Sequence, residues 1–175
     1  MGEPPSPSPH AGGITIVVSD EQDEFEIDAE RWATLAEDVL RTEGRQGELT
    51  LTFVDTEIMT ELNLEHMGEH HATDVLSFPL DADLTPDAVA TGYGPVLLGD
   101  VVVCPAVAAV NAPTHAGTLD DELALLVVHG ILHVLGHDHA DPEETATMRR
   151  RELEHLTRSH WHGAAVPVGF RQEQL

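Results

Sequence analysis

Residues 128–140 read VHGILHVLGHDHA, and this stretch determines both the expected fold and the expected function. His129 and His133 are four residues apart in a predicted helix. Positions i and i+4 lie on one helix face one turn apart, so both imidazoles can reach the same ion. Gly136 is the natural end of that helix, because the position just past a helix favours a positive φ. His139, three residues further on, can supply a third ligand from the returning chain.

This pattern predicts a metal site. Three imidazoles and one open position for water are typical of a catalytic zinc, whereas structural zinc sites are closed by four protein ligands. The rest of the predicted helix is apolar, so two imidazoles on it would be costly to bury without partners. Cys104 is the only cysteine, which excludes a cysteine-based zinc site and an intrachain disulfide. We therefore predict one Zn²⁺ held by His129, His133 and His139. A lone histidine such as His137 is interpreted instead as a satisfied core residue.

The spacing also matches the zinc-peptidase pattern H-E-x-x-H-x-x-G-x-x-H in its three histidines and its glycine. The glutamate that serves peptidases as general base is replaced here by Gly130. A metal still lowers the pKa of its water without that carboxylate, but the proton shuttle for amide cleavage is missing. The sequence thus favours a substrate with a better leaving group or with its own acid–base groups. A phosphodiester of RNA qualifies, because its 2′-hydroxyl is an internal nucleophile. A zinc peptidase-like hydrolase stays as an alternative.

Hydrophobic periodicity on both sides of this stretch predicts a single α+β domain, with helices packed on one central sheet of about four strands. The expected strands are residues 14–18, 49–53, 75–78 and 96–104. The expected helices are residues 29–42, a short one capped by Asp55, residues 106–112, one capped by Thr118 that ends at Gly136, and one after Pro142. We expect the domain to span residues 13–162, between a disordered tail over 1–12 and a flexible tail over 163–175.

The charge of the chain excludes several kinds of partner. Its 8 basic residues, all of them Arg, face 32 Asp and Glu residues, for a formal net charge of −24. Extended binding to duplex nucleic acid needs clustered basic residues, and anionic lipid would repel such a chain. A local site remains open, where one divalent ion and a few His or Arg side chains meet a short single strand. No stretch can span a bilayer and no signal peptide is visible, so we expect the cytoplasm and no membrane.

Two further motifs precede the histidines. Residues 73–79 read TDVLSFP, and the opening Thr-Asp pair either builds a turn or faces a site. Residues 97–103 read LLGDVVV, where Gly99 inside an apolar strand indicates a bulge or a close approach of another segment. The neighbouring Asp100 either orients a metal-bound histidine or lies on the solvent face.

Together, HGILHVLGHDH, TDVLSFP and LLGDVVV resemble the YbeY family of bacterial rRNA maturation factors, over about residues 14–160. The resemblance implies a small α+β domain and a single-strand-specific endoribonuclease that matures the 3′ end of 16S ribosomal RNA and serves ribosome quality control. It implies one metal ion, usually taken as zinc, at the positions of His129, His133 and His139. The implied partner is single-stranded RNA or an rRNA precursor, and the sequence does not fix an oligomeric state.

The chain departs from the family pattern at one place. Many members carry an aromatic residue and an arginine after the Leu-Asn pair that corresponds to residues 62–63. This chain has His66 and Met67 there, so a phosphate-binding cation is missing from that position. His66, His70 or His71 could take its place, because a protonated imidazole can meet a phosphate. Alternatively, these histidines are solvent-exposed loop residues.

Asp138 is the candidate catalytic residue, because it lies beside two histidines of the cluster in sequence. It would act as general base or orient a ligand, and the alternative is an Asp that merely opens a turn. A second function is also open, that of a ribosome assembly factor with a mainly structural zinc. Its acidic surface would suit ribosomal proteins or a ribosome-associated GTPase. A fourth ligand such as His137 or Asp141 would favour that alternative, and an open position would favour the nuclease.

Overall fold

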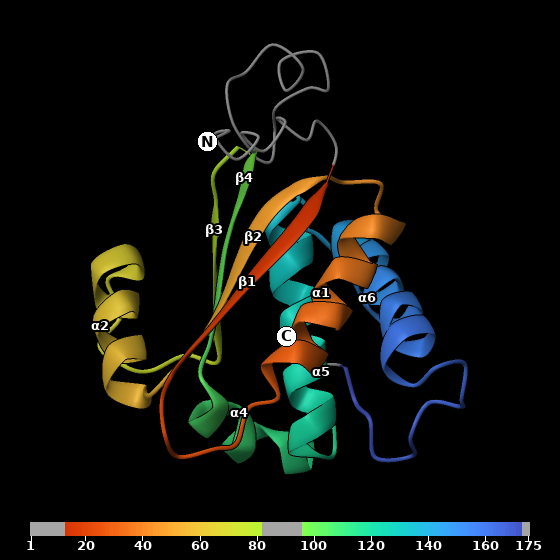
Figure 1. The fold of residues 1–175 in the computed structure, drawn as a ribbon. Coiled ribbons are helices and arrows are strands. Elements are labelled where there is room, and N and C mark those ends of the chain that lie inside the picture. The colour runs from red at the N-terminus through yellow and green to blue at the C-terminus, as the bar shows by residue number, and fades with distance from the viewer. Residues whose placement is uncertain (1–12, 82–95, 173–175) are drawn as a thin grey trace, which may run out of the picture.

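The computed structural model describes residues 13–81 and 96–172 (Figure 1), so the tail predicted over residues 1–12 lies outside the described residues. Its elements, in chain order, are β1 (Ile14–Glu21), α1 (Ala29–Thr42), β2 (Gly47–Val54), α2 (Thr56–Met67), β3 (Val75–Pro79), β4 (Leu97–Val103), α4 (Pro105–Asn111), a 3₁₀ turn (Ala112–Thr114), α5 (Leu119–Val134), α6 (Pro142–His155) and a π-helical turn (Leu156–His160). The expected strands and helices are present, with bounds that differ by a few residues.

The strands form one sheet in the order β1-β2-β4-β3. β1 pairs with β2 and β2 with β4 in parallel, whereas β3 pairs antiparallel with β4. Helices α1 and α5 cover one face of the sheet, α6 lies outside them on the same side, and α2 lies over the other face (Figure 1). The predicted α+β domain with a four-stranded sheet is therefore confirmed.

Side chains at the helix starts set the bounds of α2 and α5. The Asp55 carboxylate accepts the backbone N–H of Ile58 at 2.8 Å. The Thr118 hydroxyl oxygen accepts the backbone N–H of Asp121 at 3.1 Å. Each bond satisfies a donor in the first turn that has no partner within the helix. Both caps were predicted from the sequence and are confirmed.

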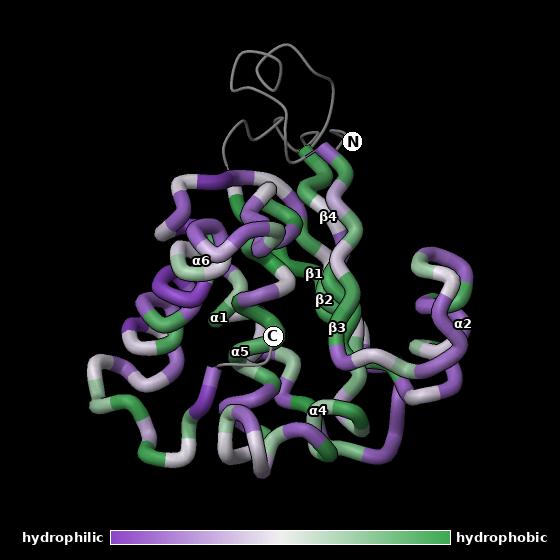
Figure 2. Tube along the Cα trace, turned by 180° about the vertical axis from the view of Figure 1, so that it is seen from behind, coloured by the Kyte–Doolittle hydropathy of each residue, from purple (hydrophilic) through white to green (hydrophobic). Residues whose placement is uncertain are grey.

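Helix α5 is the centre of the hydrophobic core. Nearly all of its residues from Asp121 to Val134 are buried. In Figure 2 the hydrophobic residues concentrate on α5 and the strands, while α2 and α6 are largely hydrophilic. α5 therefore lies between the sheet and the helices outside it, and whatever it carries at its ends has a rigid support. Within the described ranges, no helix is both long and apolar enough to cross a membrane.

Two glycines let neighbouring elements pack closely on and around β4. A Cβ on Gly130 of α5 would lie 2.5 Å from Cγ1 of Val101 in β4. A Cβ on Gly99 of β4 would lie 2.5 Å from the carbonyl oxygen of Phe78 in β3, and the pairing of β4 with β2 shifts register beside it. The bulge and close approach predicted for Gly99 are both confirmed.

The chain after the last helix returns to the domain. Gly169 lies against Gly117, where an added Cβ would come within 2.9 Å of the Gly169 carbonyl oxygen. The ring of Phe170 packs edge-on against Trp161, with centroids 5.0 Å apart. The predicted domain boundary at residue 162 did not anticipate these contacts, because each joins residues that no local sequence pattern connects.

Candidate metal centre

Three histidines meet at the C-terminal end of α5. The ring centroids are 4.6 Å apart for His129 and His133, 5.0 Å for His133 and His139, and 5.7 Å for His129 and His139. One ligand nitrogen of each ring lies within 4.8 Å of those of the other two. The structure thus brings together the three residues that the sequence spacing selected.

The turn after α5 places the third histidine. Gly136 has a φ of +98°, and its N–H donates to the His133 carbonyl oxygen at 3.0 Å. The N–H of His137 donates to the Leu132 carbonyl oxygen at 2.9 Å. These two bonds form a Schellman motif, which ends a helix and reverses the chain through a left-handed residue. The reversal brings His139 back toward the two histidines on the helix.

A buried carboxylate from α6 orients the first histidine. Nδ1 of His129 lies 2.6 Å from Oε1 of Glu152, which is only 1% exposed. Because Nδ1 is engaged there, Nε2 is the nitrogen left to bind an ion, and a carboxylate that accepts the other ring N–H is the usual support of a metal-bound histidine. Sequence reasoning missed Glu152, which lies in a charge-rich helix where nothing distinguishes it from its neighbours.

The surroundings of His133 favour its neutral imidazole. Burial, together with the neighbouring rings of His129 and His139, lowers the pKa of His133 to about 4. At neutral pH this side chain therefore carries a free lone pair, which is the state that binds a metal. Three imidazole nitrogens that lie within reach of one another, with a carboxylate behind one of the rings, fit a divalent ion such as zinc.

The residues that could have closed the site are engaged elsewhere. Nε2 of His137 is 3.9 Å from the Glu43 carboxylate, and Asp141 caps α6 by accepting a backbone N–H at 2.8 Å. The Asp138 carboxylate accepts the backbone N–H of His139 at 2.7 Å, which is a turn contact beside the cluster. Among the described residues, no further His, Cys, Asp or Glu joins this group. One coordination position therefore stays open on the protein side.

Close packing leaves no room for a glutamate side chain at Gly130, the position where zinc peptidases carry their general base. Gly130 faces β4 so closely that even a Cβ would meet Val101, and its carbonyl oxygen accepts the Ser77 hydroxyl of β3 at 2.9 Å. A glutamate at this position would displace the sheet from the helix. The absence of that base is therefore built into the contact between α5 and the sheet.

The two upstream motifs take different roles. Asp74 builds a turn, since its carboxylate accepts the backbone N–H of Val75 at 2.8 Å, and its side chain is partly buried. Burial raises the pKa of Asp74, and the charge of Glu122 raises it further. Asp100 cannot orient a metal-bound histidine, because its neighbour Val101 faces α5 and successive side chains of a strand point to opposite faces.

The histidines that replace the family's aromatic-arginine pair lie apart from the cluster. The ring of His66 packs against Phe78, with centroids 4.6 Å apart. His70 and His71 are exposed, and Nε2 of His71 lies 3.6 Å from the Glu69 carboxylate. The structure does not bring any of the three into the group formed by the three metal-site histidines.

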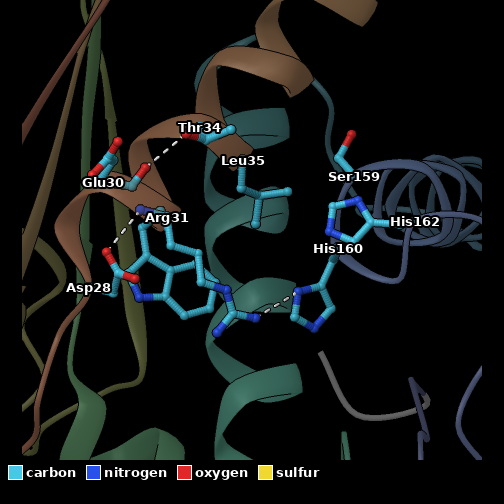
Figure 3. Close-up of a pocket in the computed structure, with 9 residues that line it drawn as sticks. Asp28, Glu30, Arg31, Thr34, Leu35, Ser159, His160 and His162 are labelled. Carbon is cyan, nitrogen blue, oxygen red and sulfur yellow. Dashed lines mark hydrogen bonds between the residues drawn. The ribbon is translucent and has the colours of Figure 1, made fainter.

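A second set of potential ligands lies at the other end of α5. Nε2 of His160 is 2.7 Å from an oxygen of Asp121, and the same oxygen accepts the indole N–H of Trp161 at 3.0 Å. Asp120 pairs with Arg31, which borders a cavity of about 330 Å³ between α1 and the π-helical turn. Figure 3 shows Arg31 directed toward His160 beside this cavity. Each of these ligand groups already has a partner within the protein.

The start of α5 carries another buried pair. Nδ1 of His115 lies 2.7 Å and 2.8 Å from the two oxygens of Glu122, which is fully buried and also accepts the backbone N–H of Ala116 at 3.0 Å. The hydrogen bond to Glu122 raises the pKa of His115, although burial opposes it. This pair joins the loop before α5 to the helix.

The fold and the site together define a small α+β protein whose central helix ends in a candidate three-histidine metal centre. A family model described as Endoribonuclease YbeY matches residues 17–160. The chain belongs to this family of endoribonucleases, and the family implies an RNA substrate.

Several curated relatives share that description. An Endoribonuclease YbeY from Renibacterium salmoninarum is 48% identical over 112 residues, which are 64% of this chain and 71% of the relative. One from Salinispora tropica is 50% identical over 106 residues, or 58% of this chain and 68% of the relative. One from Frankia casuarinae is 39% identical over 155 residues, or 86% of this chain and 76% of the relative.

The fold is also found in a solved structure. The solution structure of TM1509 from Thermotoga maritima superposes with a TM-score of 0.53 at 23% identity, and the match covers 88% of this chain and 99% of that one. At this level of identity the likeness supports the fold alone.

Proposed function

We propose that this protein is a single-strand-specific, zinc-dependent endoribonuclease that acts in 3′-end maturation of 16S rRNA and in ribosome quality control in the cytoplasm. The observation that carries the proposal is the group of three histidines with an open position, in a chain of the endoribonuclease YbeY family. A catalytic zinc site has three protein ligands and a free position, whereas a structural one is closed.

We assign a separate role to each residue of the site. His129, His133 and His139 would hold one Zn²⁺, and Glu152 would keep the His129 ring in place. When bound, the ion supplies Lewis-acid polarisation of a phosphoryl oxygen. We propose Asp138 as the group that accepts the proton of the attacking hydroxyl, because it is exposed and adjoins His139.

Charge shapes how RNA would reach the site. A chain with a net charge of −24 repels an extended polyanion, so we expect weak binding to free RNA. Ribosomal proteins or a ribosome-associated GTPase would then present the rRNA strand, since an acidic surface suits basic partners. Removing repulsion by added salt should strengthen RNA binding, which is opposite to the behaviour of a basic RNA-binding protein.

The test combines metal analysis with a cleavage assay on purified protein. Wild type should carry about one zinc per chain and cleave single-stranded RNA or rRNA precursor, and His129→Ala should lose both. His162→Ala is the matched control, because it removes an exposed histidine outside the cluster. Equal cleavage by wild type and His129→Ala would contradict the proposal. An inactive wild type with full zinc occupancy would favour the assembly-factor alternative.

A further inference from the structure

The C-terminal segment, residues 169–172, packs against the loop before α5 and the hydrophobic core. Gly117 has a φ of +98°, a conformation that side chains disfavour, and it leaves the space that Gly169 occupies. The next residue, Phe170, packs on Trp161 and on the hydrophobic core. Both contacts hold residues 169 and 170 against the domain.

Two hydrogen bonds then tie this segment to α6 and to the loop before α5. The backbone N–H of Arg171 donates to the carbonyl oxygen of His115 at 2.6 Å. The side-chain amide of Gln172 donates to the carbonyl oxygen of Arg149 on α6 at 2.9 Å. The segment thus bridges the loop before α5 and α6, and α6 carries the Glu152 carboxylate that contacts His129.

The same amide reaches the carboxylate behind the metal-site histidines. Nε2 of Gln172 donates to Oε2 of Glu152 at 2.6 Å, while Oε1 of Glu152 engages Nδ1 of His129 at 2.6 Å. Glu152 is 1% exposed, so water cannot replace either partner readily. A buried carboxylate oxygen without a donor is costly, and the carboxylate would rotate toward another donor to relieve that cost.

We propose that Gln172 is a positioning residue of the metal centre, which holds the Glu152 carboxylate in the orientation that fixes the His129 ring. The C-terminal segment is then part of the site, although it lies outside the residues 17–160 that match the family model. The inference rests on the proposed metal centre, because its functional consequence is tighter binding of the ion by His129.

Metal affinity measured in matched variants tests this chain of contacts. Gln172→Met keeps the length of the side chain and removes its donor, and we expect it to weaken Co²⁺ or Zn²⁺ binding about fivefold. That loss is smaller than the roughly 10- to 100-fold expected for Glu152→Gln, which changes the direct partner of a ligand. Val168→Ala is the control, because its side chain is fully exposed in the same stretch and should leave affinity unchanged.

A double-variant cycle separates positioning from a general effect on folding. If Gln172 acts through Glu152, Gln172→Met should have no further effect on affinity in the Glu152→Gln background. The visible absorption of bound Co²⁺ should change in Gln172→Met and stay as in wild type in Val168→Ala. A variant that melts earlier but binds Co²⁺ with wild-type affinity and spectrum would overturn the proposal, and so would an equal loss of affinity in both backgrounds.

A metal-free measurement distinguishes this inference from the proposed function. Imidazole ¹⁵N chemical shifts of the apo protein should report a His129 ring protonated at Nδ1, with a mixture of tautomers in Gln172→Met. Unchanged shifts in the variant would overturn the positioning role. A wild type that shows this tautomer but binds neither Co²⁺ nor Zn²⁺ would contradict the metal centre and support only the orienting contact.

Discussion

The two ends of α5 use the same residue types in opposite ways. At the start of the helix, the carboxylates of Asp121 and Glu122 lie on α5, and each is paired with one histidine from elsewhere in the chain. At its end, the histidines lie on α5 and in the following turn, and they face one another rather than carboxylates. Among the residues that the structure describes, His129 alone has a carboxylate hydrogen-bonded to its ring there, and it uses Nδ1 for that contact.

This difference in partners separates the structural pairs at the start of α5 from the candidate metal centre at its end. A histidine that is hydrogen-bonded to a buried carboxylate has a raised pKa, as His115 does, so the pair favours the charged form of the ring. A buried histidine among other imidazoles has a lowered pKa, as His133 does, and keeps a lone pair available. The predictions that follow test whether the two ends of α5 are separate in this way, from the largest expected effect to the smallest.

Removing a ligand should have the largest effect. His133→Ala should reduce bound zinc from about one ion per chain to background and abolish RNA cleavage, because two imidazoles hold the ion far less tightly than three. His160→Gln, at the other end of α5, should retain the metal. Inductively coupled plasma mass spectrometry on the folded variants measures both. Loss of zinc in His160→Gln would show that the two ends are not separate.

Breaking the buried pair at the start of α5 should affect stability rather than metal binding. Glu122→Gln should lower the free energy of unfolding by about 3 kcal/mol, because it leaves His115 without its anionic partner in the interior. Denaturant unfolding measures this. Glu37→Gln is the matched control, since it breaks a largely exposed ion pair with Arg41 and should cost about 0.5 kcal/mol or less. Similar losses in the two variants would argue against the role of burial.

Adding a side chain at Gly130, where α5 packs against the sheet, should destabilise the fold. Gly130→Ala should lower the free energy of unfolding by about 2 kcal/mol, because its Cβ would lie 2.5 Å from Val101. Gly13→Ala is the control, since an added Cβ there meets nothing within 4 Å. Thermal melts of the two variants would decide, and a Gly130→Ala protein as stable as wild type would contradict the packing explanation for the missing glutamate.

The smallest effect should be in the pH dependence of stability. The folded pKa of His115 is raised above its ordinary 6.5, so its stabilising pair with Glu122 is complete below about pH 6.5 and is lost as the pH rises through the folded pKa. The stability difference between wild type and His115→Gln should therefore be greatest in mild acid and shrink in mild alkali. Unfolding curves from pH 6 to pH 9 measure it, and a difference that grows with pH would have the wrong sign.

Local patterns in the sequence were sufficient to predict α5, its Thr118 cap, its end near Gly136 and the meeting of the three histidines. These features depend on helix periodicity and turn chemistry over a dozen residues. A sheet of about four strands was predicted, but not the strand order or the antiparallel pairing of β3. Both depend on contacts between distant segments. The spacing of apolar residues carries no information about which strands are neighbours.

The supporting residues could not be predicted for the same reason. Glu152 is 23 residues from His129 and Gln172 a further 20 from Glu152, and each meets its partner only because α5, α6 and the C-terminal segment pack together. For Asp100 the sequence left two roles open, orienting a metal-bound histidine or lying on the solvent face, and the alternation of the strand excludes the first.

An anomalous-scattering map at the zinc edge, from crystals of the protein purified with zinc, tests the central claim most directly. The account predicts one strong peak at about 2.1 Å from one nitrogen each of His129, His133 and His139, with no fourth protein ligand. It also predicts that the Glu152 carboxylate stays on the far nitrogen of His129. A peak at Asp121 and His160 instead, or a fourth side chain closing the three-histidine site, would contradict it.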